Sequence, residues 1–135
     1  MRHGFKLMAA AAAFAMCAGC GRGDLPDLAE VEGTVKLDGQ PLPNVLVSFY
    51  PQDGGRPGSC VTDDQGHYEL DYVDGEKGTK PGMNRVEVTM VWPDGEPTPG
   101  VKDTVPAKYQ GIGSSLSLDV KAGESNVYDI DMTSN

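Results

Sequence analysis

The chain has few of the residues from which metal sites, disulfide frameworks and acid–base catalysts are built. Its 135 residues include three cysteines, two histidines and one tryptophan. Beyond residue 20, only Cys60 and His67 remain of the cysteines and histidines. This leaves no partner for an internal disulfide and no cysteine–histidine spacing for zinc. No serine lies in a nucleophile elbow beside a base. We therefore expect no cofactor and no enzymatic activity.

Basic residues are also scarce. The chain has 11 lysines and arginines against 20 aspartates and glutamates, a net charge of -9. An acidic surface of this kind repels phosphate backbones, so the composition argues against nucleic-acid binding. The acidity is typical of a protein kept soluble outside the cytoplasm.

The longest apolar run, from Leu7 to Ala18, has only 12 residues. A membrane-spanning helix needs about 20 residues, so this run is too short for a permanent span. The basic residues Arg2, His3 and Lys6 precede the run. The small residue Ala18 ends the run, and the small residue Gly19 follows it. This order is typical of a secretory signal, and we expect residues 1–19 to be removed.

The segment that ends in Cys20 resembles the lipobox of bacterial lipoproteins, with Cys17 where a leucine usually stands. The resemblance implies palmitate and related acyl chains on Cys20, and hence a membrane as a partner. Residues 20–29 are then expected to form a lipidated tether. Gly21 rather than aspartate after the cysteine implies sorting to the outer membrane, with the periplasmic or outer surface left open. The remaining Cys60 is expected to be a small, half-buried strand residue.

Residues 30–135 predict a single all-β domain. Apolar and polar residues alternate with the period of half-buried strands in about seven segments, and no helical period is visible. Turn signals such as Asp38-Gly39 and Asp63-Asp64-Gln65-Gly66 separate the segments. The pattern favours two antiparallel sheets packed over one core. The expected strands are 31–37, 45–50, 59–62, 67–72, 85–92, 115–120 and 128–132.

Several of these segments together resemble a carboxypeptidase regulatory-like domain, of the kind common in small lipoproteins of planctomycete bacteria. The residues that carry the likeness are Val31-x-Gly33-x-Val35, Asp38-Gly39-x-Pro41-Leu42-Pro43-Asn44-Val45, Val47-x-Phe49, Thr62-Asp63-x-x-Gly66-x-Tyr68-x-Leu70 and the later run Val105-Pro106-x-Lys108-Tyr109 through Leu116, Val120, Gly123 and Asn126. The resemblance implies a transthyretin-like (prealbumin-like) β-sandwich of seven strands. It does not imply peptidase activity, because the regulatory module of that family lies beside a separate catalytic domain.

Each of these motifs also has a purely structural explanation. Gly33 permits a close backbone approach or a bulge, and Gly66 supplies turn geometry that side chains resist. Thr62 and Asp63 are suited to bonding backbone groups at the turn. The hydroxyisourate hydrolases, which are enzymes on the transthyretin scaffold, use several histidines and a Tyr-Arg-Gly-Ser-type tail. The chain matches neither feature, and His67 is expected to be a solvent-facing strand residue.

Three alternatives remain open for binding or crosslinking. Calcium would be held by the oxygen ligands of acidic turns, with Asp63, Asp64, Asp71 and Asp74 as the candidates. An internal Lys–Asn crosslink, as in the similar Cna B-type domains, would need Lys36, Glu69 and Asn126. The loop 93–108 is long enough to be a binding element, with Trp92, Asp94, Glu96 and Asp103 as candidate contacts. The alternation of the preceding strand nevertheless favours Trp92 as a core residue.

The sequence thus predicts a non-enzymatic, membrane-anchored lipoprotein that acts as a structural or protein-interaction module of the cell envelope. The alternative is an extracytoplasmic module that binds glycans or calcium through the loop 93–108 and the acidic turns. Envelope proteins or glycans are the expected partners.

Overall fold

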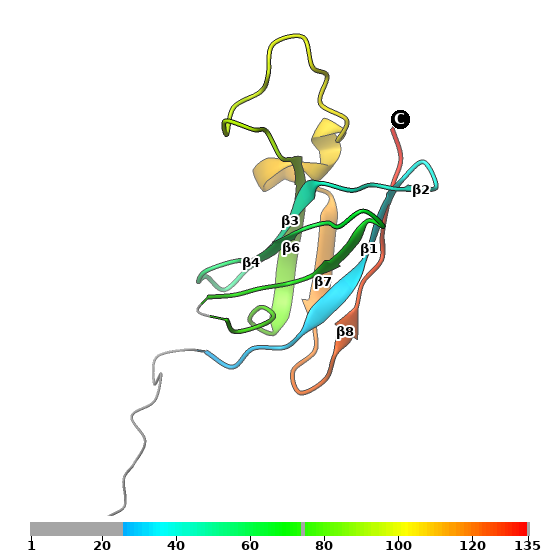
Figure 1. Cartoon of the computed structure of the whole chain (residues 1–135). Helices are drawn as coiled ribbons and strands as arrows, with labels where there is room; N and C mark the ends of the chain where they lie inside the picture. The colour runs from blue at the N-terminus through cyan, green and yellow to red at the C-terminus, as the bar shows by residue number, and fades with distance from the viewer. Residues whose placement is uncertain (1–25, 74, 135) are drawn as a thin grey trace, which may run out of the picture.

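The alternating segments form a β-sandwich in the computed structural model, which describes residues 26–73 and 75–134 (Figure 1). The all-β prediction is confirmed, and only two short 3₁₀ turns are helical in the described part of the chain. In chain order the elements are β1 (Val31–Leu37), β2 (Gln40–Pro41), β3 (Val45–Pro51), β4 (Gly58–Val61), β5 (His67–Glu69), β6 (Gly82–Met90), η1 (Ala107–Tyr109), η2 (Gly111–Gly113), β7 (Leu116–Val120), β8 (Asn126–Val127) and β9 (Ile130–Met132).

The four-stranded sheet has the order β4-β3-β6-β7, and every neighbouring pair is antiparallel. β3 and β6 form its centre, and their register runs from Val45 opposite Met90 to Pro51 opposite Asn84. Residues 91–106, which we call the distal loop, follow β6 and lead to η1 and η2 before the chain returns as β7.

The five-stranded sheet is built around β1. β5 and β2 pair antiparallel with one edge of β1, whereas β8 and β9 pair parallel with the other edge. The sheets are thus mostly antiparallel, as expected, and the pairs that β8 and β9 form with β1 are the parallel exception. After β7 the chain crosses from one sheet to the other, so that β8 and β9 run in the same direction as β1.

The strand count is nine among the described residues rather than seven, partly because β8 precedes the last expected strand, 128–132, of which β9 forms the end. Between them, the backbone oxygen of Tyr128 accepts a hydrogen bond from the Tyr68 hydroxyl at 2.5 Å. The Asp129 carboxylate accepts from the Thr34 backbone N–H at 3.0 Å, in place of a backbone carbonyl. Two side-chain bonds thus interrupt the ladder at the residues that separate the two strands. The two-residue strand β2, after the Asp38-Gly39 turn, adds a further strand that the alternation did not indicate.

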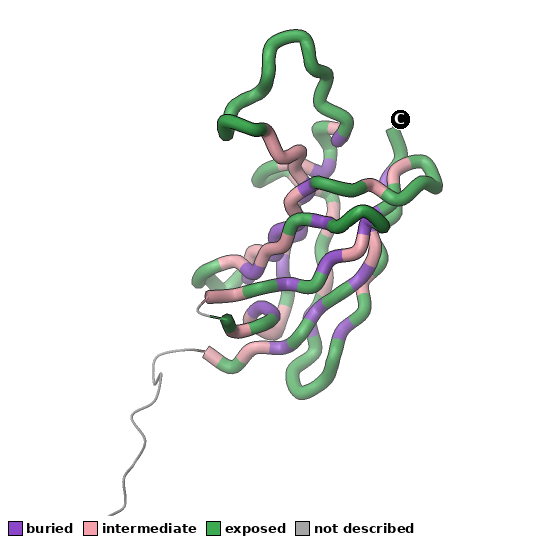
Figure 2. Tube along the Cα trace, viewed as in Figure 1, coloured by how far each residue is buried: buried purple, intermediate pink, exposed green. Residues whose placement is uncertain are grey.

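The core lies between the sheets, where the predicted inward faces meet (Figure 2). It contains Val31, Val35, Val45, Val47, Phe49, Tyr68, Leu70, Val86, Val88, Val120, Ile130 and Met132, all nearly inaccessible to solvent. Phe49 is central, since the ring of Tyr128 meets it edge-on with centroids 6.1 Å apart and Tyr68 lies 6.3 Å away.

Two glycines have the structural roles predicted for them. A Cβ on Gly33 would lie 2.0 Å from the Tyr128 carbonyl oxygen, so only glycine lets β1 approach the segment between β8 and β9 this closely. Gly66 has a φ of 76°, which is the left-handed region that the Asp63–Gly66 turn needs. In the same turn the Asp63 carboxylate accepts hydrogen bonds from the backbone of Gln65 and His67, both at 2.9 Å.

Candidate functional site

The sandwich has two ends with different architecture. Ala29, just before β1, exchanges two backbone hydrogen bonds with Thr79, just before β6. The distal loop begins where β6 ends, at Met90. β6 has nine residues, and at about 3.3 Å per residue it separates the two ends by about 30 Å. We call the end at Ala29 the tether end and the opposite one the loop end (Figure 1).

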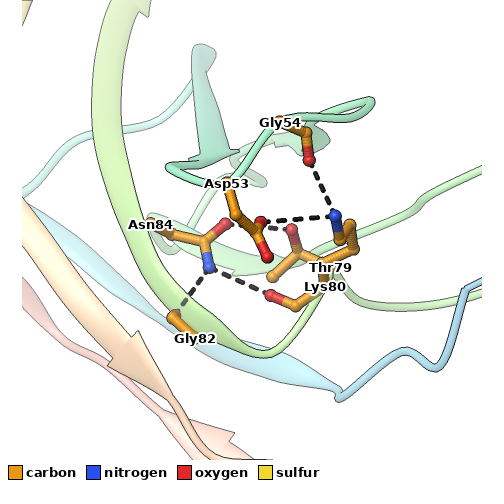
Figure 3. Close-up of polar contacts among 6 residues, drawn as sticks. All are labelled: Asp53, Gly54, Thr79, Lys80, Gly82 and Asn84. Carbon is orange, nitrogen blue, oxygen red and sulfur yellow. Dashed lines mark hydrogen bonds and ion pairs between the residues drawn. The ribbon is translucent and has the colours of Figure 1, made fainter.

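A buried polar cluster fastens the tether end (Figure 3). Thr79 and Asn84 are both fully buried. The Thr79 hydroxyl donates to Asn84 Oδ1 at 3.1 Å, and Asn84 Nδ2 donates to the carbonyls of Lys80 and Gly82 at 3.0 and 2.9 Å. Lys80 Nζ extends the cluster outward to the Gly54 carbonyl at 2.9 Å and to the Asp53 carboxylate at 3.3 Å.

The role of this cluster is to fix the position at which the chain enters the sandwich, and not to bind a ligand. Its amide and hydroxyl groups bond one another and the backbone, as buried polar groups must in a stable fold. Since Thr79 is also the partner of Ala29, the cluster fixes the point at which the chain enters the sandwich. Ala29, expected as the last tether residue, is already 3% exposed and part of the core.

The loop end displays a long exposed segment on a fixed base. Residues 93–104 are all exposed, as the tube in Figure 2 shows. The C-terminal part of the distal loop is anchored by Val105, which is 3% exposed, and by Tyr109 in η1. Asp103 accepts from the Val105 backbone at 2.9 Å and from Gln110 Nε2 at 3.1 Å, so it braces the loop against its own base.

Tyr109 joins the base of the loop to the end of the chain. Its hydroxyl accepts from the Thr133 backbone N–H at 2.9 Å. Hydrogen bonding with Thr133, foremost with its side chain, lowers the pKa of the Tyr109 phenol. Lys108 Nζ donates to the Thr133 hydroxyl at 3.1 Å and lies 5.2 Å from the centre of the Tyr109 ring.

A cleft of about 320 Å³ opens beside this base. It is lined by Leu37, Lys102, Asp103, Thr104, Pro106 and Ser134. The cleft combines apolar side chains with a lysine, a carboxylate and hydroxyls, which is a lining suited to a small polar ligand or a side chain of a partner.

The predicted loop contacts do not form one cluster. Asp94 and Glu96 lie on the exposed part of the loop, whereas Asp103 is engaged at its base and borders the cleft. Trp92 is half-buried and does not belong to the core, so its expected core position is wrong. β6 ends at Met90, the last residue with a partner on β3, and Trp92 therefore lies beyond the sheet.

Sequence reasoning missed two features of the loop end. Tyr109 and Thr133 are 24 residues apart, and no local pattern signals their contact. Ile112 is 86% exposed and Val101 48% exposed, so the loop end also displays apolar side chains. The glycines on both sides of Ile112 were the available signal, because they deny it neighbouring side chains to pack against.

The carboxylates proposed as calcium ligands either form other hydrogen bonds and ion pairs or are not grouped with one another. The Asp63 carboxylate holds its own turn, and Asp71 forms an ion pair with Lys77 at 2.6 Å. Asp64 is exposed, and Asp74 lies outside the described residues. Within residues 26–73 and 75–134, no group of three or more histidine, cysteine, aspartate or glutamate side chains is arranged to hold a metal ion.

The Lys–Asn crosslink does not fit the register of β1. Lys36 lies opposite Asp131, whereas Asn126 lies opposite Val31. These positions are separated by five residues, or more than about 15 Å along the strand. The Asn126 amide nitrogen instead lies 3.1 Å from three backbone carbonyl oxygens, those of Glu30, Lys121 and Glu124, which share its two N–H donors.

Cys20, the expected lipid attachment site, lies outside the described residues. Cys60 is half-buried on β4, as expected, and His67 is half-buried on β5 beside its turn. Among the described residues, no helix has the length and apolar character needed to cross a membrane.

In comparisons with known proteins, no family model, no curated protein and no solved structure matches the chain.

Proposed function

We propose that this protein is a non-enzymatic lipoprotein of the cell envelope, anchored through Cys20 and displaying a β-sandwich that contacts partner proteins. The outer membrane is the favoured site. The carboxypeptidase regulatory-like resemblance is part of this proposal, and it supplies the fold rather than an activity.

The single observation that carries the proposal is the placement of the two ends. The N-terminal side of the chain enters the sandwich at Ala29, where the Thr79–Asn84 cluster fixes it. The exposed distal loop projects from the opposite end, about 30 Å away along β6. An anchor at Cys20 therefore leaves the loop end turned away from the membrane and accessible to partners.

The polar side chains support a binding role better than a catalytic one. The half-buried pair Arg85 and Glu87 joins at 2.5 Å, and Arg85 lies 4.8 Å from the centre of the Tyr50 ring, so both charges are engaged with each other. His67 lies beside its turn on β5, and Cys60 lies on β4, in the other sheet. A nucleophile and a base would need to lie within hydrogen-bond reach of each other.

Labelling with radioactive palmitate in a bacterial host tests the anchor. The wild-type chain is expected to incorporate label, and Cys20→Ala is expected to lose it. Cys60→Ala is the matched control, because it removes another cysteine and should retain the label. Equal labelling of wild type and Cys20→Ala would overturn the anchor.

The partner role is tested by crosslinking in intact envelopes followed by capture of the protein. A variant in which residues 95–100 are replaced by glycine and serine keeps the base of the loop and changes its exposed tip. We expect this variant to lose crosslinked partners that Val127→Ser, a change at the exposed residue of β8, retains. Identical partners in both variants would exclude the loop tip as the contact.

A glycan-binding module at the loop end is the second candidate, and the cleft beside the loop base favours it. Trp92 is the only tryptophan of the chain and lies at the start of the loop, so its emission reports on this end alone. A saturable emission change and a rise in melting temperature with one glycan would support this candidate. The absence of both across a glycan panel would leave the protein-interaction role.

A further inference from the structure

The edges of the two sheets differ in how well they are protected. The outer strands of the five-stranded sheet, β2, β5, β8 and β9, have only two or three residues each. The β4 edge of the other sheet is bridged, because Ser59 exchanges backbone hydrogen bonds of 2.9 and 3.0 Å with Asp71. Short strands and covered edges both prevent further strands from adding.

β7 has neither protection. It has five residues and pairs with β6, and no other strand among the described residues pairs with it. In an antiparallel pair, peptide groups point alternately toward and away from the neighbour, so about half of the β7 groups face outward. Leu116 and Leu118 point toward the core but remain half-exposed, which shows that the core is open at this edge.

The open stretch can be located more closely. At one end of β7, the Leu116 backbone N–H donates to the Ser114 hydroxyl at 3.2 Å. At the other end, the Lys121 N–H donates to the Asn126 side chain at 2.9 Å. The Lys121 bond closes the outward edge at its end, whereas the Leu116 N–H faces β6, because the Ser114 hydroxyl in turn donates to the Val86 carbonyl. The segment 117–120 contains no proline and no inward-pointing charge.

We propose that the β7 edge binds an extended segment of a partner protein, which adds to the sheet as a fifth strand. Unpaired backbone groups call for an occupant with backbone groups of its own in the extended conformation. The inward side chains of the added strand would be apolar, to cover Leu116 and Leu118. Its outward side chains would be basic, because the whole chain has a net charge of -9. On the outer face itself, Asp119 forms an exposed ion pair with Lys121 at 2.9 Å, for which a basic side chain of the partner would compete.

A second copy of the chain is a poorer occupant. β7 runs from the loop end to the tether end. If the β7 strands of two copies paired antiparallel, the second copy would therefore be inverted relative to the first. The two tether ends would then lie on opposite sides of the assembly, which is incompatible with two anchors in one membrane. This argument against a second copy rests on the proposed function, because it requires the membrane anchor.

The test uses the full chain, purified in detergent and labelled with ¹⁵N, and two synthetic probe peptides. One peptide alternates lysine and valine, and the other alternates glutamate and valine. We expect the lysine–valine peptide to shift the amide signals of residues 117–120 and to bind at least tenfold more tightly than the glutamate–valine peptide. It should also slow the hydrogen exchange of Ser117 and Asp119, whose N–H groups face away from β6, at least tenfold. Binding by neither peptide at these amides, or shifts confined to the distal loop, would overturn the proposal.

Two variants separate edge binding from nonspecific attraction. Leu118→Lys places a charge at the inward face of the edge and is expected to weaken binding at least tenfold. Asp119→Lys breaks the exposed ion pair with Lys121 and leaves two lysines on the outer face, so it should reverse the preference between the two peptides. Val127→Lys, at a residue 68% exposed on β8, is the control that should bind like the wild type. Equal binding by all variants would contradict the edge site.

Light scattering without peptide addresses the second copy. If the protein is a monomer, the result supports binding of a strand from a partner protein. If it is a dimer that Leu118→Lys dissociates, the result overturns that proposal in favour of pairing between two copies of β7. Because peptide binding is measured in detergent, it does not depend on the anchor. Loss of palmitate labelling and loss of peptide binding therefore report separately on the proposed function and on the β7 edge.

Discussion

β1 and β7 have the same alternation of apolar and polar residues but very different surroundings. β1 has strands on both edges, with β5 and β2 on one side and β8 and β9 on the other. β7 pairs with β6 on one edge, and no second strand among the described residues joins it. Val31 and Val35 of β1 are at most 1% exposed, whereas Leu116 and Leu118 of β7 remain half-exposed.

The difference shows that a strand's position in the sheet, more than its own pattern, decides how much a substitution costs. At β1 a side chain meets neighbours on each side, so added or missing atoms cannot be accommodated. At β7 one side is solvent, and changes can relax outward. The predictions below compare the two strands, from the largest expected effect to the smallest.

Gly33→Ala on β1 is expected to have the largest effect. Its Cβ would meet the Tyr128 carbonyl oxygen at 2.0 Å, so the backbone between β8 and β9 must shift. We expect the free energy of unfolding to fall by about 3 kcal/mol, which urea denaturation measures. Gly113→Ala is the matched control, because nothing lies within 4 Å of its Cβ position, and it should change stability by less than about 0.5 kcal/mol. Similar losses in both variants would show that β1 is not the crowded strand.

Tyr68→Phe removes the hydrogen bond that joins β5 to the segment following β8. The Tyr128 carbonyl oxygen loses its 2.5 Å donor, and we expect a loss of about 1–3 kcal/mol at neutral pH. Tyr72→Phe, at a half-buried residue beyond the end of β5, is the control and should stay within about 0.5 kcal/mol of the wild type.

The same substitution changes stability at alkaline pH. Burial, before all other causes, raises the pKa of Tyr68 far above its usual value of about 10. The stabilisation is fully present below pH ~10 and is lost as the pH rises, because the unfolded chain releases a proton that the folded chain retains. The stability curves of wild type and Tyr68→Phe should therefore converge above pH ~10. Parallel curves up to pH 11.5 would contradict the raised pKa.

Leu118→Lys on β7 is expected to cost only about 1 kcal/mol, because the side chain is half-exposed and a lysine stem can cover apolar surface while its charge reaches water. The same change at Val35, which is 0% exposed on β1, should prevent folding. Thermal unfolding of the two variants measures the contrast directly. Comparable destabilisation would mean that the β7 edge is covered.

Asp63→Asn is expected to have the smallest effect, which is present at neutral pH and lost at acidic pH. Hydrogen bonds from the backbone of His67, and then of Gln65, lower the pKa of Asp63 in the turn that leads to β5. A lowered pKa stabilises the folded state above the unfolded value of about 3.9, and this contribution is lost as the pH falls. The difference between wild type and Asp63→Asn should therefore shrink between pH ~5 and ~3. Urea denaturation over this pH range measures it, and a difference that stays constant would contradict the lowered pKa.

The candidate site was less predictable than the strands. The exposed loop was expected from its prolines, its glycines and its length, and Asp94 and Glu96 lie on it. Trp92 was misplaced because the alternation continues past Met90, where the register with β3 ends. The contact between Tyr109 and Thr133 has no sequence signal, because it joins residues 24 positions apart.

By itself, the sequence determined where the longer strands lie, which of their faces are apolar, and that glycine is required at Gly33 and Gly66. These properties follow from alternation and backbone sterics over a few residues. Only the tertiary structure decided that β1 is central and β7 is an edge, that β8 and β9 run parallel to β1, and that Asn84 closes the tether end. Strand order, direction and edge exposure depend on pairings between distant residues, and a local period of two is the same for a central strand and for an edge strand.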